Sequence, residues 1–220
     1  EQDEENSEYG GNILDNIPSE LTRHDSASKT NEFHFSHLDK NARLREYQGP
    51  LRWLDEAMIV NLARNTTEPS PALTLNLDDR RLKCYLMDTG LLINLSFGDG
   101  NYIDNDLYNA ILTDRLHVNE GMFVENVIAQ CLRINGHKIV FYVEYDKNGN
   151  MLLDIDFLIR KDKKVIPIEA KSGEKYTIKS LEKLKKKFSN KIGLQYVLHE
   201  GDIKRENEIL YFPYYITSIL

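Results

Sequence analysis

Hydrophobic and polar positions alternate most clearly in the second half of the chain. The stretches "KIVFYVEY", "MLLDIDFLI" and "KVIPIEAK" have the apolar spacing and β-branched content of strands. The Asn-Gly pair in "DKNGN" favours a hairpin turn between the first two. In "NEGMFVENVIAQCLRIN" the apolar residues repeat with a helical period, and Gly136 follows as a stop signal. The pattern predicts a helix over 119–135, strands over 138–145, 151–159 and 164–171, a helix over 177–190, and strands over 194–200 and 208–216.

The first half gives a weaker pattern of two or three helices followed by a β-hairpin. Ser36 and Asp39 resemble a capping box at the start of a helix whose apolar period continues to Met58, with a break at Gly49-Pro50. The other predictions are an acidic tail or linker over 1–10, a short helix beginning near Pro18, polar loops over 21–33 and 96–106, and strands over 72–77 and 83–88. Residues 11–100 therefore predict a winged-helix-like module, and the whole chain predicts an α/β (α+β) fold.

Composition places the chain among globular proteins. It has 220 residues, 41% of them hydrophobic, and no apolar run reaches the roughly 20 residues that a bilayer requires. Cys84 and Cys131 are far apart, so neither a disulfide framework nor a zinc site is indicated, and a cytoplasmic location is expected. Because the sequence begins at Glu1 without a methionine, we expect it to be part of a longer or processed protein.

The formal charge of −7 conceals a strong asymmetry along the chain. Residues 160–191 contain twelve Lys or Arg and four acids, a local charge of +8. This window permits a polyanion-binding face on an acidic protein, for which the candidate residues are Lys179, Lys183, Lys186 and Lys187. A solvated helix face that binds nothing is the alternative.

The stretch "LDIDFLIRKDKKVIPIEAKSG" carries the candidate chemistry. Alternation along a strand predicts that Asp154 and Asp156 share one face, opposite Phe157, and that Glu169 and Lys171 share a face of the next strand. Paired carboxylates repel unless a cation lies between them, and hard oxygen ligands suit Mg²⁺ or Mn²⁺. A lysine beside such a site could orient or activate water for attack on a phosphodiester. The alternative is the polar face of a half-exposed sheet with ordinary cross-strand ion pairs.

These residues resemble the core of the PD-(D/E)xK, restriction-endonuclease-like superfamily. More narrowly, "KCYLMDTGLL", "GMFVENVIAQ" and the stretch above resemble the nuclease-like C-terminal region, a domain of unknown function, of prokaryotic AAA-superfamily ATPases. The resemblance runs from about Phe33 to the C-terminus and implies a nuclease-like domain over 101–220. It implies catalytic roles for Glu125, Asp156, Glu169 and Lys171, with Mg²⁺ or Mn²⁺ at Asp156 and Glu169 and a further acid at Asp154.

The same resemblance implies an ATPase module upstream and in cis. The chain has no Gly-x-x-x-x-Gly-Lys-Ser/Thr loop, so no ATPase activity is expected from the residues given, and ATP would bind only the upstream module. DNA is the expected partner, no membrane is expected, and an oligomer is possible.

Four further residues have structural interpretations. His34 and His37 have helical spacing but no evident third ligand, which favours surface histidines over a metal site. Trp53 is expected in the core rather than as a platform for stacked bases. Pro167 lies inside a predicted strand and favours an edge strand or a bulge there.

Two hypotheses about function follow. The first is a metal-dependent nuclease-like domain that hydrolyses phosphodiester bonds in DNA, with Asp156, Glu169 and Lys171 on one sheet face and Glu125 reaching in from a helix. The second is a non-catalytic module that binds nucleic acid, or regulates or assembles the ATPase. Retained metal-binding residues do not by themselves establish turnover, so the sequence leaves both open.

Overall fold

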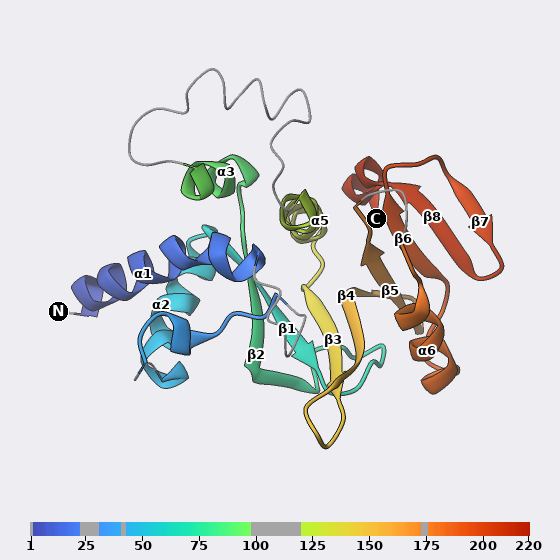
Figure 1. Ribbon diagram of the computed structural model, residues 1–220, viewed down its shortest axis with the longest axis horizontal. Coiled ribbons are helices and arrows are strands. Elements are labelled where there is room, and N and C mark those ends of the chain that lie inside the picture. The colour runs from blue at the N-terminus through green and yellow to red at the C-terminus, as the bar shows by residue number, and fades with distance from the viewer. Residues whose placement is uncertain (1, 23–30, 41–42, 98–119, 173–175) are drawn as a thin grey trace.

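The computed structural model describes residues 2–22, 31–40, 43–97, 120–172 and 176–220 (Figure 1). Eight strands within these residues form one mixed sheet, in the order β2-β1-β3-β4-β5-β6-β8-β7. The pairs β1–β3, β5–β6 and β6–β8 are parallel, and the other pairs are antiparallel. The strands are β1 Val60–Thr66, β2 Leu77–Leu86, β3 Val140–Tyr145, β4 Met151–Lys161, β5 Lys164–Ala170, β6 Gln195–His199, β7 Lys204–Glu206 and β8 Ile209–Pro213. This arrangement confirms the mixed α and β class.

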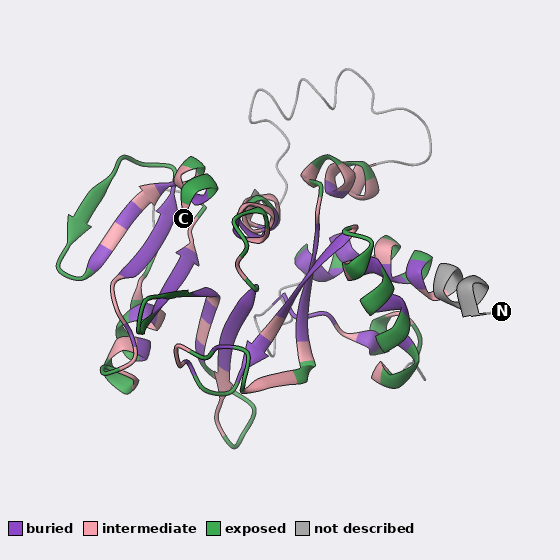
Figure 2. Ribbon diagram, turned by 180° about the vertical axis from the view of Figure 1, so that it is seen from behind, coloured by how far each residue is buried: buried purple, intermediate pink, exposed green. Residues whose placement is uncertain are grey.

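Helices cover both faces of the sheet. They are α1 Gln2–Thr22, α2 Leu44–Glu56, α3 Thr89–Phe97, α5 Glu120–Ile134 and α6 Lys179–Lys187, with short 3₁₀ helices η1 Phe35–His37 and η2 Tyr214–Ile219. On one face, here called the α5 face, buried residues of α1, α2, α3 and α5 pack with Phe141, Phe157 and Ile168. On the other, the α6 face, Leu181 and Leu184 pack with Ile155 and Val197. Figure 2 shows buried residues following the central strands, whereas the edge strand β7 is exposed.

The second half of the chain confirms the predicted order of helix, three strands, helix and strand. Each element begins and ends within a few residues of its predicted limits. Gly136 follows α5 with φ +82°, and its N–H bonds to the carbonyl of Arg133, the geometry that a glycine stop permits. Gly149 has φ +83° in the predicted Asn-Gly turn. No sequence pattern predicted β7.

The first half differs from the prediction at several points. Residues 2–10 are helical, as the beginning of α1, rather than a tail. The helix predicted from residue 36 begins at Leu44 instead and continues through Gly49 and Pro50 without a break. The stretch 72–77 forms a turn up to β2, and the partner of β2 is β1. The loops predicted over 21–33 and 96–106 lie largely outside the described residues.

β1 and β2 belong to the same sheet as the strands of the second half. β1 pairs in parallel with β3 through Arg64 opposite Val140 and Asn65 opposite Phe141. The expected wing of a separate winged-helix module is therefore an outer part of one continuous sheet. The division of the chain at residue 100 remains a prediction about independent folding.

Pro167 lies in an interior strand, which corrects the expectation of an edge. Val165 makes two backbone hydrogen bonds to the segment before β6. Its N–H donates to the Lys191 carbonyl at 2.9 Å, and its carbonyl accepts the Gly193 N–H at 2.8 Å. Pro167, two residues later, has its nitrogen on that same side, and the β5–β6 pairing begins only at Ile168. The missing N–H therefore removes no ladder hydrogen bond.

Candidate functional site

Asp156 lies where β4 and β5 separate. Phe157 opposite Ile168 is the last pair of these strands toward the carboxyl end of β5. Beyond it, the Ala170 N–H donates to Asp156 Oδ2 at 2.9 Å. The Asp156 carboxylate therefore occupies the gap between the strands, where a strand carbonyl would otherwise accept this hydrogen bond.

A register shift in the β3–β4 pairing determines the direction of the neighbouring side chains. Val140 pairs with Leu158 but Tyr142 pairs with Ile155, so Asp156 and Phe157 together lie opposite Phe141. One extra residue on a strand is a β-bulge, which interrupts the alternation of faces. Phe157 consequently packs on the α5 face, not opposite the aspartates as the sequence pattern predicted.

Glu169 and Lys171 form a buried ion pair at the end of β5. Glu169 is 3% exposed, and its Oε2 pairs with the Lys171 ammonium, while its Oε1 is buried without a hydrogen-bond partner. Burial, followed by the charge of Asp156, raises the pKa of Glu169 to about 8, although Lys171 opposes this shift. Burial lowers the pKa of Lys171, but Asp156 and Glu169 outweigh burial, so this pKa lies above its ordinary value.

The acids approach the β4–β5 gap from two directions. Asp154 is in register with Val143, which packs on the α5 face. Glu169 is in register with Val197, which packs on the α6 face. Asp156, in the gap, influences the pKa values of both groups. The acids therefore meet at the gap rather than on one shared face as expected.

Glu125 reaches the site from α5 and is held by three groups. Its Oε2 accepts hydrogen bonds from Asn31 Nδ2 at 2.6 Å and from the Tyr85 hydroxyl at 2.9 Å. Lys83 Nζ lies 3.9 Å from the same oxygen and 3.9 Å from Asp156 Oδ1. The resemblance implied a role for Glu125. Its motif "KCYLMDTGLL" contains Lys83 and Tyr85, but the sequence analysis assigned no role to either residue or to Asn31. The lysine inside the strand-like run "RRLKCYL" was a signal that could have indicated Lys83.

Lys83 and the acids around it shift each other's pKa values. Burial raises the pKa of Asp154 to about 7 against the opposing charge of Lys83. Burial also raises the pKa of Glu125, which Lys83 again opposes. Burial lowers the pKa of Lys83, but Glu125, Asp154 and Asp156 outweigh it, so the amine stays charged.

α5 is fixed to β2 by one buried amide. Asn126 Oδ1 accepts the Leu86 N–H at 2.8 Å, and its Nδ2 donates to the Leu86 carbonyl at 3.1 Å and to Thr89 Oγ1 at 3.0 Å. Asn126 is fully buried. Because Glu125 is the adjacent residue, these bonds also determine where its carboxylate lies relative to β2.

The described acids do not form a multi-carboxylate metal centre. No group of three or more His, Cys, Asp or Glu within the described residues is placed to bind a metal. However, Glu169 Oε1 and Asp154 Oδ1 are buried carboxylate oxygens without hydrogen-bond partners. An oxygen of this kind is costly unless a proton or a cation compensates it. Of the two expected metal ligands, Glu169 therefore has an oxygen that a cation would compensate, whereas Asp156 Oδ2 already accepts the Ala170 N–H.

The lysines of α6 differ in their surroundings. Lys183 donates to the Leu152 carbonyl at 3.2 Å, Lys187 pairs with Glu144, and Lys185 donates to the Ile192 carbonyl at 3.0 Å. Within the described residues, no hydrogen bond or ion pair involves the ammonium groups of the remaining two, Lys179 and Lys186. Part of the predicted basic face is therefore already engaged within the protein.

The structure also places the histidines, the tryptophan and the cysteines that the sequence analysis considered. His37 Nδ1 lies 2.8 Å from the buried Glu20 Oε1, and the His34 ring contacts that of His37. Trp53 is 44% exposed, which corrects its expected place in the core. Cys84 and Cys131 are both free thiols.

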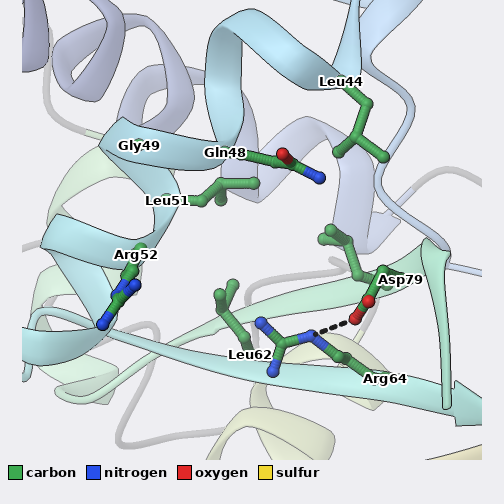
Figure 3. A pocket seen from close by; sticks show the side chains of 9 residues that line it. Leu44, Gln48, Gly49, Leu51, Arg52, Leu62, Arg64 and Asp79 are labelled. Atoms are coloured by element: carbon green, nitrogen blue, oxygen red, sulfur yellow. Dashed lines mark ion pairs between the residues drawn. The ribbon is translucent and has the colours of Figure 1, made fainter.

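Two of the cavities lined by described residues differ in their relation to the candidate site. One of about 140 Å³ adjoins the site and is lined by Leu21, Asn31, Gly121, Met122, Val124, Glu125, Ala170 and Ser172. A larger one, about 390 Å³, lies between α2 and the β1–β2 hairpin (Figure 3). Arg64 and Asp79 pair at 3.2 Å along its wall, and none of the predicted site residues lines it.

Comparison with known proteins gives a match to one family model over part of the chain. Residues 120–215 match the family model described as "Domain of unknown function (DUF4143)". The matched range includes all four predicted catalytic residues but neither Lys83 nor Tyr85. The curated proteins and the solved structures contain no match to the chain. Within the described residues, no helix is both long enough and apolar enough to span a membrane.

Proposed function

We propose that the gap between β4 and β5 is a metal-dependent site for hydrolysis of phosphodiester bonds in DNA, in a domain attached to an AAA-type ATPase. The observation that best supports this proposal concerns Glu169. Its carboxyl group is buried, one of its oxygens has no hydrogen-bond partner, and Asp156 and Lys171 are its charged neighbours. The resemblance of the motif to PD-(D/E)xK nucleases supports the same reaction and supplies the ATPase context.

The residues would divide the work as follows. Asp156 and Glu169 would bind Mg²⁺ or Mn²⁺, which when bound polarises a phosphodiester and lowers the pKa of a water ligand. Lys171 keeps its proton at neutral pH, so it stabilises the negative charge that develops on the phosphate rather than accepting a proton. Glu125, fixed by Tyr85 and Asn31, compensates the buried charge of Lys83 beside Asp156.

Incubation of the protein with supercoiled plasmid and Mn²⁺ tests this proposal. We expect nicking that Glu169→Gln reduces at least about 100-fold, because the change removes a metal ligand and its charge. Glu200→Gln is the matched control, because it makes the same chemical change at an exposed glutamate. It should leave the nicking rate unchanged. Equal cleavage by wild type and Glu169→Gln would show that the activity comes from elsewhere.

The second candidate is a module that binds nucleic acid, or regulates or assembles the ATPase, without catalysis. One observation favours it: the described residues contain no group of three or more His, Cys, Asp or Glu placed to bind a metal. Salt-dependent DNA binding with no cleavage in Mn²⁺ or Mg²⁺ would support this function. A change in the activity of the attached ATPase when the module is removed would support a regulatory role.

A further inference from the structure

Lys83 places an ammonium group inside the acid cluster, between residues from different elements. Its side chain is 1% exposed, and Nζ lies 3.9 Å from Glu125 Oε2 on α5 and 3.9 Å from Asp156 Oδ1 on β4. The pairing of β2 with β1 sets Lys83 opposite Ala63, two strands away from β3. The amine therefore crosses part of the sheet face to reach the acids, over the Phe141 ring at 5.2 Å.

A buried ammonium is costly unless nearby anions compensate it. Removal of an isolated cation from water costs several kcal/mol, and the charges of Glu125 and Asp156 offset that cost here. The compensation is mutual, because these carboxylates are themselves largely removed from water. Lys83 thus supplies the positive charge that a divalent ion would supply in a cluster made of carboxylates alone.

The hydrogen bonds of Glu125 agree with this arrangement. Its Oε2 already accepts from Asn31 and Tyr85 and lies beside Lys83. An oxygen so engaged has little remaining capacity to coordinate a metal. Glu169 Oε1, by contrast, has no hydrogen-bond partner. The two ends of the acid cluster therefore differ: the Glu125 end contains a cation of the protein, and the Glu169 end has an oxygen available.

We infer that Lys83 is a built-in cation that occupies the position of a divalent metal ion between Glu125 and Asp156. The site therefore takes one metal ion, at Asp156 and Glu169, rather than two. The statement about this one remaining ion rests on the proposed function. The exclusion of an ion from the Glu125 side depends only on Lys83 and its neighbours.

Counting bound Mn²⁺ by calorimetry tests the inference without measuring activity. Lys83→Met keeps the length of the side chain and removes its charge, so it should bind one more Mn²⁺ than wild type does. Lys83→Arg keeps a cation and should bind the same number as wild type. Addition of Glu125→Gln to Lys83→Met should abolish the extra ion. Equal Mn²⁺ counts for wild type and a folded Lys83→Met would overturn the inference.

Thermal unfolding gives a second readout. Lys83→Met should be less stable than wild type in EDTA, and saturating Mn²⁺ should raise its Tm by roughly 5–10 °C more than it raises that of wild type. In the wild-type background, Glu125→Gln should change the Mn²⁺ affinity less than about twofold, since Lys83 blocks that side. A tenfold loss of Mn²⁺ affinity in the Glu125→Gln variant would overturn the inference. This test remains valid even if Lys83→Met does not fold.

The inference and the proposed function fail in different ways. If the Glu169→Gln variant binds as many Mn²⁺ ions as the wild-type protein does, the proposed metal site is wrong. The gain of an ion by Lys83→Met would still support the role of Lys83. If wild type binds two Mn²⁺ ions and one depends on Glu125, the inference fails and the proposed function stands.

Discussion

Two buried carboxyl groups make the stability of the metal-free protein depend on pH. Burial raises the pKa of Asp154 to about 7 and that of Glu169 to about 8, well above the values of unfolded chains. At pH values between the unfolded pKa and the folded pKa of each group, the folded protein retains a proton that the unfolded chain has released. The stabilisation is therefore complete below about pH 4 and is lost as the pH rises through about 8.

We therefore predict that the free energy of unfolding in EDTA falls between pH 5 and pH 8. The slope should reach up to about 1.4 kcal/mol per pH unit for each retained proton. Urea unfolding monitored by circular dichroism at several pH values measures it. Combining Asp154→Asn with Glu169→Gln should flatten the profile, whereas Glu200→Gln should not. A wild-type profile that rises across this range would contradict the assigned pKa shifts.

At the scale of residues, the sequence indicated the acids but not their surroundings. Asp156, Glu169 and Lys171 lie close together because β4 and β5 are adjacent strands of a short hairpin, a local relation that alternation can predict. Lys83 and Tyr85 come from β2, which lies three positions from β4 in the sheet. No local pattern specifies that arrangement. The bulge at Asp156 escaped prediction for a similar reason, since it depends on the register with β3.

At the scale of elements, α5 depends on its link to β2 through Asn126. Asn126→Ala would leave the Leu86 N–H without an acceptor in a fully buried place. We expect a loss of about 2–3 kcal/mol in unfolding free energy, measured by urea denaturation. Asn148→Ala, in an exposed turn, is the matched control and should change stability by less than about 0.5 kcal/mol. Equal effects of the two changes would show that the amide does not anchor the helix.

The α6 lysines should divide into structural and DNA-binding groups. The paired variant Lys179→Ala/Lys186→Ala should leave stability unchanged and reduce the salt slope of DNA binding by up to about 2, near 0.9 per lost phosphate contact. Lys185→Ala loses bonds to the Ile192 carbonyl and to Glu208, so it should cost about 1 kcal/mol in stability with little effect on the slope. Fluorescence anisotropy at several salt concentrations checks both. An unchanged slope for the paired variant would remove α6 from the DNA interface.

Elements were predictable where local patterns and final pairing agree. β3, β4 and β5 alternate strongly and are joined by short turns, so local signals determine them. β1 contains "VNLARNT", whose polar residues gave no strand signal, and its place comes from pairing with β2 and β3. The opening acidic stretch likewise read as a tail although the structure has it as part of α1. Tertiary pairing outweighed local propensity in these segments.

At the scale of the whole molecule, the two halves share one sheet through a short contact. β1 and β3 pair at two positions, and Asn65 Oδ1 also accepts the Val143 N–H at 2.9 Å. If residues 1–100 are removed, β3 becomes an exposed edge strand and the buried side chain of Phe141 loses its cover on that side. Glu125 simultaneously loses Lys83 and Tyr85, which leaves its carboxylate poorly compensated.

We therefore predict that residues 101–220 expressed alone will not fold to a stable monomer. Without β1 and β2 the fragment combines an apolar sheet edge, which favours aggregation, with uncompensated buried acids near Glu125. Size-exclusion chromatography and thermal unfolding, compared with the full 220-residue chain under the same conditions, measure the outcome. Mixing the fragment with residues 1–100 should restore a cooperative transition, because the missing strand pairs and the Lys83 cation return together. A fragment that unfolds cooperatively within a few degrees of the full chain would instead establish the division at residue 100.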